Sequence, residues 1–117
     1  MPDPTNVSIT TTLTPCNFTL HQDEDLGADS VIWTNNTTSP AIWTMAGASD
    51  VLATTAPPNE DSPAADTYTI NPGQTLQLWV SDDFQVGDGV NKQYNVSVNG
   101  TNISCINADP PDMQIEP

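Results

Sequence analysis

The chain has 117 residues, with 15 acidic side chains against a single Lys or Arg, so its formal net charge is −14. This length is that of one domain, residues 1–117, and the charge excludes nucleic acids and anionic lipid surfaces as partners, because both require clustered cations. No stretch approaches the roughly 20 consecutive apolar residues of a membrane-spanning helix, so we expect no membrane insertion.

Alternation of apolar and polar side chains, which is typical of half-buried strands, runs through the first half of the chain. It predicts one strand over residues 7–13 that continues at 18–20 beyond Pro15. Two β-branched and aromatic runs follow at 30–34 and 41–45, and the polar residues between them indicate a turn. We therefore expect these two runs to form a hairpin with a polar tip.

Residues 47–66 lack this alternation. The stretch contains three prolines and several acidic residues, a composition that is typical of loops. It is the longest segment without a strand pattern, so we expect a long acidic, proline-rich loop there.

Short strands and turns alternate again in the second half. Residues 67–70 and 76–80 have strand patterns on either side of Asn71-Pro72-Gly73, where proline suits the second turn position and glycine supplies a positive φ at the third. Residues 94–98 alternate as well, and Asn99-Gly100 is a strong hairpin signal. Two more strands are expected, at 102–106 and 113–115.

The two cysteines, Cys16 and Cys105, stand near opposite ends of the chain. An even cysteine count in a chain so poor in lysine favours an oxidising compartment, where a disulfide persists. We therefore expect a Cys16–Cys105 disulfide and a secreted, extracellular or periplasmic protein. The alternative is a pair of buried free thiols, since no Cys-X-X-Cys motif indicates a redox or zinc site.

About eight or nine short strands at spacings of roughly 8–12 residues predict an all-β protein, an antiparallel Greek-key β-sandwich. The apolar strand positions would fill a core about 10 Å thick between the two sheets. The expected core residues are Val7, Ile9, Leu13, Val31, Trp33, Leu76, Leu78, Val80, Tyr94, Val96, Val98 and Ile115.

Four segments in the chain carry short motifs. Residues 31–35 read V-x-W-x-N, and residues 72–75 read P-G-x-T. Residues 89–96 run from Gly89 through Tyr94-Asn95-Val96, similar to a G-x-Y-x-Y pattern, and residues 109–115 form a closing strand pattern. In this order they resemble the strands and turns of cupredoxins, the plastocyanin-like copper proteins. The resemblance implies a cupredoxin-like sandwich. Similar turns occur in immunoglobulin-like domains, which are the alternative fold.

The resemblance does not extend to the copper ligands. A blue-copper site needs two histidines, one cysteine and a weak axial ligand, and this chain has one histidine, His21. Thr37-Thr38-Ser39-Pro40 stands where the family has its first histidine, and Val96-Ser97-Val98 stands where Cys-x-His is expected after Tyr94. We therefore expect no cofactor, and a copper electron-transfer protein is only the second alternative.

The acidic loops are candidates for binding calcium, which takes six to eight oxygen ligands. Asp82, Asp83 and Asp88 offer three carboxylates around one turn, although their spacing does not match an EF-hand. Loop charge that is simply solvated is the other interpretation. With calcium bound, an immunoglobulin-like adhesion domain stabilised by the ion becomes the first alternative function.

Tryptophan side chains are candidates for ligand recognition. Trp79 alternates with the core positions of its strand, so we expect it to point outward, whereas Trp33 is expected in the core. An exposed tryptophan on a flat sheet face is typical of recognition of a carbohydrate or a protein partner. Trp79 is thus the ligand-binding candidate, and burial under the long loop is the alternative.

No catalytic set is recognisable, because the single histidine, His21, has no nucleophile in its sequence context. Seven Asn-X-Ser/Thr triplets occur, but they would be glycosylated only in a suitable secretory pathway, and chance also produces them in an Asn- and Thr-rich chain. We therefore expect no enzyme, but a non-catalytic binding or structural module, secreted or at the cell surface.

Overall fold

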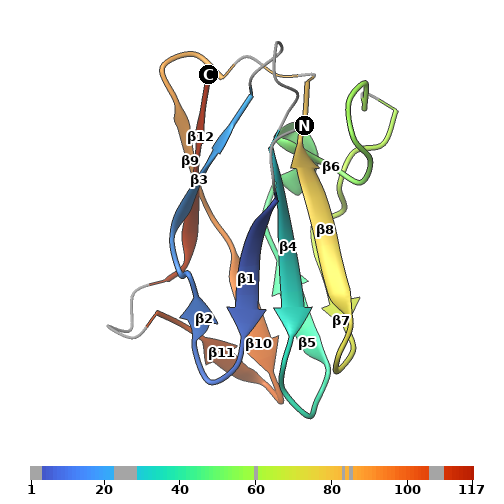
Figure 1. The fold of residues 1–117 in the computed structure, drawn as a ribbon, viewed down its shortest axis with the longest axis vertical. Helices are drawn as coiled ribbons and strands as arrows, with labels where there is room; N and C mark the ends of the chain where they lie inside the picture. The colour runs from blue at the N-terminus through green and yellow to red at the C-terminus, as the bar shows by residue number, and fades with distance from the viewer. Residues whose placement is uncertain (1–3, 23–28, 60, 83, 85, 106–109) are drawn as a thin grey trace.

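The computed structural model describes residues 4–22, 29–59, 61–82, 84, 86–105 and 110–117, and these form an all-β sandwich (Figure 1). Its elements are β1 (Thr5–Ile9), β2 (Leu13–Thr14), β3 (Phe18–His21), β4 (Ser30–Asn35), β5 (Ala41–Thr44), the 3-10 helix η1 (Ala48–Asp50), β6 (Leu52–Ala53), β7 (Thr67–Ile70), β8 (Thr75–Val80), β9 (Val90–Gln93), β10 (Asn95–Val98), β11 (Thr101–Ile103) and β12 (Asp112–Glu116). The expected all-β sandwich is confirmed. Among these residues no helix is long and apolar enough to cross a membrane.

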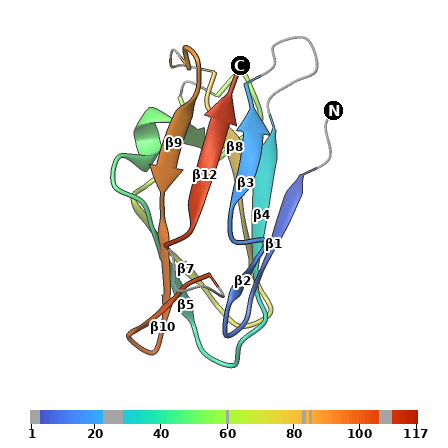
Figure 2. The same ribbon diagram turned by 90° about the vertical axis from the view of Figure 1, so that its left-hand side faces the viewer.

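The strands form two layers. One layer is the five-stranded sheet β2-β1-β4-β8-β6. The other contains the four-stranded sheet β11-β10-β5-β7 and the three-stranded sheet β3-β12-β9. These two sheets are joined because β9 leads into β10 with only Tyr94 between them, as Figure 2 shows. The molecule is elongated along its strands, with extents of 38 × 26 × 24 Å.

Two strand pairs are parallel, β1 with β4 and β3 with β12. The sheets are therefore mixed, and not antiparallel throughout. The predicted first strand is in fact two, because the main chain turns at Thr10, whose N–H donates to Thr12 O at 2.9 Å. After β2 the chain leaves the five-stranded sheet, so β3 joins the other layer. The parallel pairs favour the cupredoxin-like arrangement over immunoglobulin-like sheets, which are antiparallel.

The predicted hairpin of residues 30–34 with 41–45 is wrong. β4 lies in the five-stranded sheet and β5 in the four-stranded sheet, so the chain crosses between layers. The inward side chains explain this crossing. Trp33 and Trp43 are both fully buried and pack on each other, with ring centroids 5.3 Å apart. Each run thus contributes its apolar face to the core from an opposite layer.

Two predicted turns are confirmed. Gln74 N–H donates to Asn71 O at 2.9 Å, and Gly73 has a φ of 79°, as the third position of a type II turn requires. Asn99 and Gly100 have φ values of 54° and 78° and join β10 to β11. Two successive positive φ values are those of a type I′ hairpin turn.

Residues 47–66 include regular structure as well as loop. They contain η1 and β6, and β6 pairs with β8 at the edge of the five-stranded sheet. Ala53 forms an isolated bridge to Pro63, which folds the segment back on itself. The segment is therefore packed against the sandwich over part of its length.

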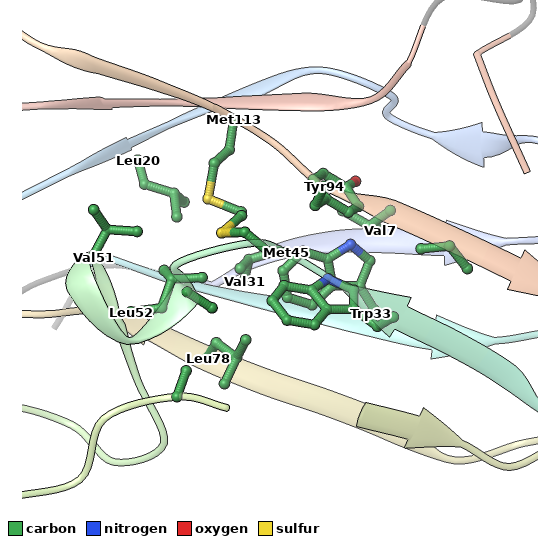
Figure 3. Packing of buried hydrophobic residues seen from close by; sticks show 14 of the residues in the cluster. Val7, Leu20, Val31, Trp33, Met45, Val51, Leu52, Leu78, Tyr94 and Met113 are labelled. Atoms are coloured by element: carbon green, nitrogen blue, oxygen red, sulfur yellow. The ribbon is translucent and has the colours of Figure 1, made fainter. Parts of the chain in front are cut away.

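The core centres on an aromatic group formed by Trp33, Trp43 and Tyr94, with Phe18 and Tyr68 at its margin. Figure 3 shows aliphatic side chains and two methionines filling the space beside it. Ten of the twelve predicted core residues are buried. The other two, Leu76 and Val98, are partly buried and pack against the core.

Candidate functional site

Trp79 lies on the outer face of the five-stranded sheet. Its neighbours along β8, Leu78 and Val80, are fully buried, and successive side chains of a strand point to opposite faces. The indole therefore points out of the sandwich, where the residue is partly exposed. Across the sheet Trp79 stands opposite Ser30 of β4 and Ala53 of β6, both of which are buried, and Ala53 also bridges to Pro63 of the long segment.

The residues around Trp79 on this face are uncharged. Ile32 of β4 stands opposite Gln77 of β8, and Asn6 of β1 stands opposite Ile32. The Gln77 Nε2 donates to the Ser30 Oγ at 3.1 Å, which fixes the amide beside the indole. We call the surface formed by Asn6, Ile32, Gln77 and Trp79, with the buried Ser30 beneath the Gln77 amide, the Trp79 face.

The strands of the layer that carries the Trp79 face contain no charged residue. No strand of the five-stranded sheet contains a charged residue, and neither does any strand of the four-stranded sheet. Titratable strand residues of the described chain, tyrosines aside, are confined to the three-stranded sheet: His21, Lys92, Asp112 and Glu116. On a chain with net charge −14, the Trp79 face is thus a neutral surface.

This neutrality lowers the free-energy cost of covering the Trp79 face. Removing an ionised group from water is costly unless it is paired, whereas amides and hydroxyls can exchange water for a partner's hydrogen bonds. The centres of protein interfaces are correspondingly poor in charge and rich in aromatic residues. The arrangement can therefore bind an uncharged ligand by stacking on Trp79 and hydrogen bonding to the amides beside it.

Asn59 is a residue near this face that the sequence analysis missed. It is 2% exposed, and its Nδ2 donates to Val80 O at 3.2 Å and to Thr55 O at 3.3 Å. Its Oδ1 accepts from Asp82 N–H at 3.0 Å. These bonds fix the segment after β6 beside the end of β8, next to Trp79. An asparagine after two prolines is typical of an exposed turn, so the sequence did not predict that Asn59 is buried.

The structure does not bring the calcium candidates together in the part of the chain that it describes. Asp82 and Asp88 are exposed, and Asp83 lies outside the described residues. Within the described ranges no group of three or more His, Cys, Asp or Glu side chains is placed to hold a metal ion. Calcium binding at these three positions remains a prediction.

The side chains do not fit a blue-copper site, which the fold family implies. His21, the only histidine, lies at the end of β3, with Nδ1 3.4 Å from Asp29 Oδ2 and Nε2 3.6 Å from Glu116 Oε2. Cys16 and Cys105, the only cysteines, are joined in a disulfide, so the chain retains no thiolate. No copper chemistry follows from this donor set.

The predicted disulfide is confirmed. Cys16 and Cys105 lie 89 residues apart in sequence, with their Cα atoms 5.4 Å apart. Cys16 follows β2 where the chain passes from one layer to the other, and Cys105 follows β11. The bond therefore connects the layer crossing near the N-terminal end to the last hairpin.

Among the residues that the structure describes, three buried polar atoms of the aromatic core have no hydrogen-bond partner: Trp33 Nε1, Trp43 Nε1 and the Tyr94 hydroxyl. Burial raises the pKa of Tyr94 to about 12, although the nearby Trp33 indole lowers it in part and the Asp112 carboxylate raises it further. The Trp33 and Tyr94 rings meet edge to face, with their centroids 5.3 Å apart. These groups lie in the core, away from the Trp79 face.

Comparison with known proteins indicates the fold. No protein-family model matches the chain, and no curated protein is similar to it in sequence. Among solved structures, the chain is similar to the McoA multicopper oxidase from the hyperthermophile Aquifex aeolicus, with a TM-score of 0.54 and 10% identity over 98% of this chain. It spans 29% of the length of that oxidase.

A second solved structure, the E. coli chaperone DraB, is similar with a TM-score of 0.41 and 10% identity, over 98% of this chain and 58% of that one. The oxidase match, to a protein with cupredoxin-like domains, supports the cupredoxin-like β-sandwich. At this identity the likeness concerns the fold alone.

Proposed function

We propose that the chain is a non-catalytic binding module that uses a cupredoxin-like sandwich as a scaffold without copper. Its ligand-binding surface is the Trp79 face. The ligand is a neutral carbohydrate, and a neutral protein surface is the alternative. The module is exported to an extracellular or periplasmic compartment.

The observation that carries this proposal is an outward-pointing tryptophan on a charge-free sheet in a strongly acidic chain. Trp79 offers a flat apolar surface, and Gln77 and Asn6 offer amides on the same face. Sugar rings have apolar faces and hydroxyl edges, so they match an aromatic platform bordered by amides. The acidic loops would repel phosphorylated or sulfated ligands, which favours a neutral one.

Export is supported by the Cys16–Cys105 disulfide, because such bonds persist in oxidising compartments and are rare in the cytosol. The non-catalytic role is supported by the single histidine, His21, because both of its ring nitrogens face carboxylates, those of Asp29 and Glu116. Subcellular fractionation and intact mass under non-reducing conditions test the compartment and the oxidation state together.

The binding role is tested by fluorescence quenching. Trp33 and Trp43 are fully buried, so acrylamide reaches mainly Trp79. We expect a neutral polysaccharide from a panel of glucans, mannans and chitin fragments to protect Trp79 from acrylamide. We expect the Trp79→Ala variant to lose at least tenfold in affinity for that polysaccharide.

Thr69→Ala is the matched control, because Thr69 is exposed on β7 in the opposite layer. It should bind as the unchanged protein does. Equal binding by Trp79→Ala and the unchanged protein across the panel would refute the carbohydrate proposal. A cross-linker placed at Gln77 that captures the same protein in the native cells, and fails to do so at Thr69, would indicate the alternative partner.

A further inference from the structure

Asn-X-Ser/Thr triplets are more frequent in this chain than its composition predicts. Serine and threonine make up 24 of the 117 residues, so random placement after the eleven asparagines gives about two triplets. The chain has seven, beginning at Asn6, Asn17, Asn35, Asn36, Asn95, Asn99 and Asn102. Composition alone therefore does not explain them.

The structure divides the seven asparagines by exposure. Asn35 is fully buried, and its Nδ2 donates to Ser39 O at 2.9 Å and to Ile70 O at 2.8 Å. That nitrogen cannot be reached or modified in the folded protein. Asn95 is partly buried, and its Nδ2 donates to Asn102 Oδ1 at 3.2 Å. The other five asparagines are exposed.

In four of the exposed asparagines, which lie away from the Trp79 face, the side-chain nitrogen is available for modification. Asn17 accepts the Asp112 N–H through its Oδ1 at 3.1 Å, and Asn102 also accepts through its Oδ1, so neither bond uses the nitrogen. Asn36 and Asn99 donate from Nδ2 to single serine hydroxyls, at 2.8 Å and 3.2 Å. A hydroxyl partner of this kind is readily replaced by water.

Two of these asparagines lie in loops at one end of the sandwich, the end at the bottom of Figure 1. The loops there are residues 10–12, 36–40, 71–74 and 99–100, and none of them contains a charged residue. Asn36 and Asn99 are in these loops, and Asn102 follows on β11. The space beside the β10–β11 turn is open, since a Cβ added at Gly100 would meet no atom within 4 Å.

We propose that Asn17, Asn36, Asn99 and Asn102 are N-glycosylation sites. A membrane transferase would supply the sugar from a lipid-phosphate-linked oligosaccharide. The asparagine Nδ2 forms a bond to the sugar C1 and loses one proton, and the C1–O bond to the lipid phosphate breaks, with the oxygen keeping the electron pair. The inference rests on the proposed export, because the acceptor triplet is used in secretory pathways.

The test uses the protein purified from the cells that make it. We expect an intact mass above the 12.5 kDa of the chain, and glycan-bearing peptides at these four asparagines. A protease that cleaves at acidic residues is needed, because the chain has 15 of them and only one Lys or Arg. Asn35 should be unmodified because it is buried. The exposed Asn71 and Asn91 should be unmodified because neither begins a triplet.

Thr101→Ala removes the triplet hydroxyl at Asn99 and should lower the mass by one glycan. Thr69→Ala is the control, because it changes an exposed strand threonine outside any triplet and should leave the mass unchanged. An intact mass equal to that of the chain in an exported protein would overturn the inference and leave the proposed function standing. A glycan on Asn6 would cover the Trp79 face and count against the proposed function alone.

Discussion

The side-chain nitrogen of Asn35, at the end of β4, donates to the main-chain oxygen of Ile70, at the end of β7, over 2.8 Å. The two strands belong to opposite layers, so this bond connects the layers at one end of the core. The Asn35 Oδ1 accepts from the N–H and the hydroxyl of Thr37, which shapes the crossing to β5. Asn35 is fully buried, and both its amide nitrogen and its amide oxygen are hydrogen-bonded, so its side chain links the two layers where the chain crosses between them.

Asn35→Ala should lower the free energy of unfolding by about 2–4 kcal/mol, because it leaves the buried Ile70 carbonyl without its donor. Urea unfolding measures the effect. Asn36→Ala is the matched control, since the adjacent Asn36 is exposed and its side-chain amide donates to the Ser8 hydroxyl, while its main-chain bond to Ile9 is kept in the variant. It should cost about 1 kcal/mol or less. Equal losses for the two variants would contradict the assigned role of Asn35.

Tyr94 and Tyr68 should respond differently to loss of the hydroxyl. The Tyr94 hydroxyl is buried and has no hydrogen-bond partner in the described part of the chain, so Tyr94→Phe should change the free energy of unfolding by less than about 1 kcal/mol or raise it. The Tyr68 hydroxyl accepts from Ala65 N–H at 2.8 Å, and Tyr68→Phe should cost about 1 kcal/mol. A greater loss in Tyr94→Phe than in Tyr68→Phe, measured by urea unfolding, would show that Tyr94 has a hydrogen-bond partner in solution.

The same tyrosine predicts a loss of stability in alkali. Burial raises the pKa of Tyr94 to about 12 in the folded protein, above the value of about 10 in the unfolded chain. The unfolded chain therefore loses this proton first, and the stabilisation is complete below pH 10 and falls as pH rises to about 12. The loss amounts to roughly 3 kcal/mol. Unfolding at both pH values should show it in the unchanged protein, and a loss equally large in Tyr94→Phe would assign it elsewhere.

The fold could be predicted from the sequence where one residue pattern determines one local structure. Glycine and asparagine adopt a positive φ with little steric strain, so the turns at Gly73, Asn99 and Gly100 could be identified from the sequence. Alternation likewise gave the inward and outward faces, including Trp33 inside the core. These are local constraints that each strand carries by itself.

Strand partners could not be predicted in the same way. The runs on either side of Asn35 suit a hairpin and a layer crossing equally well, and the choice depends on Trp33 packing against Trp43 across the core. The parallel pairing of β1 with β4 depends on distant segments too. For the candidate site, alternation indicated that Trp79 points outward, but the charge-free surroundings became visible only once the strands were placed in sheets.

Removing the disulfide should destabilise the chain strongly. Cys16 and Cys105 close a loop with a sequence separation of 89 residues, for which loss of chain entropy in the unfolded state gives about 4–5 kcal/mol. The Cys16→Ser/Cys105→Ser double variant should lose close to this amount in urea unfolding. Reduction of the unchanged protein should lose the same amount, and a thermal midpoint insensitive to reductant would contradict the prediction.

Salt should stabilise the protein, because 15 acidic residues face a single lysine, Lys92, and their repulsion is long-range at low ionic strength. The screening distance falls from about 10 Å at 0.1 M salt to about 3 Å at 1 M. We expect the thermal midpoint to rise over this range, equally in NaCl and in CaCl₂ of matched ionic strength. An extra rise in CaCl₂ that disappears in Asp82→Asn/Asp88→Asn would instead establish the calcium site, since these substitutions remove two of its predicted ligands.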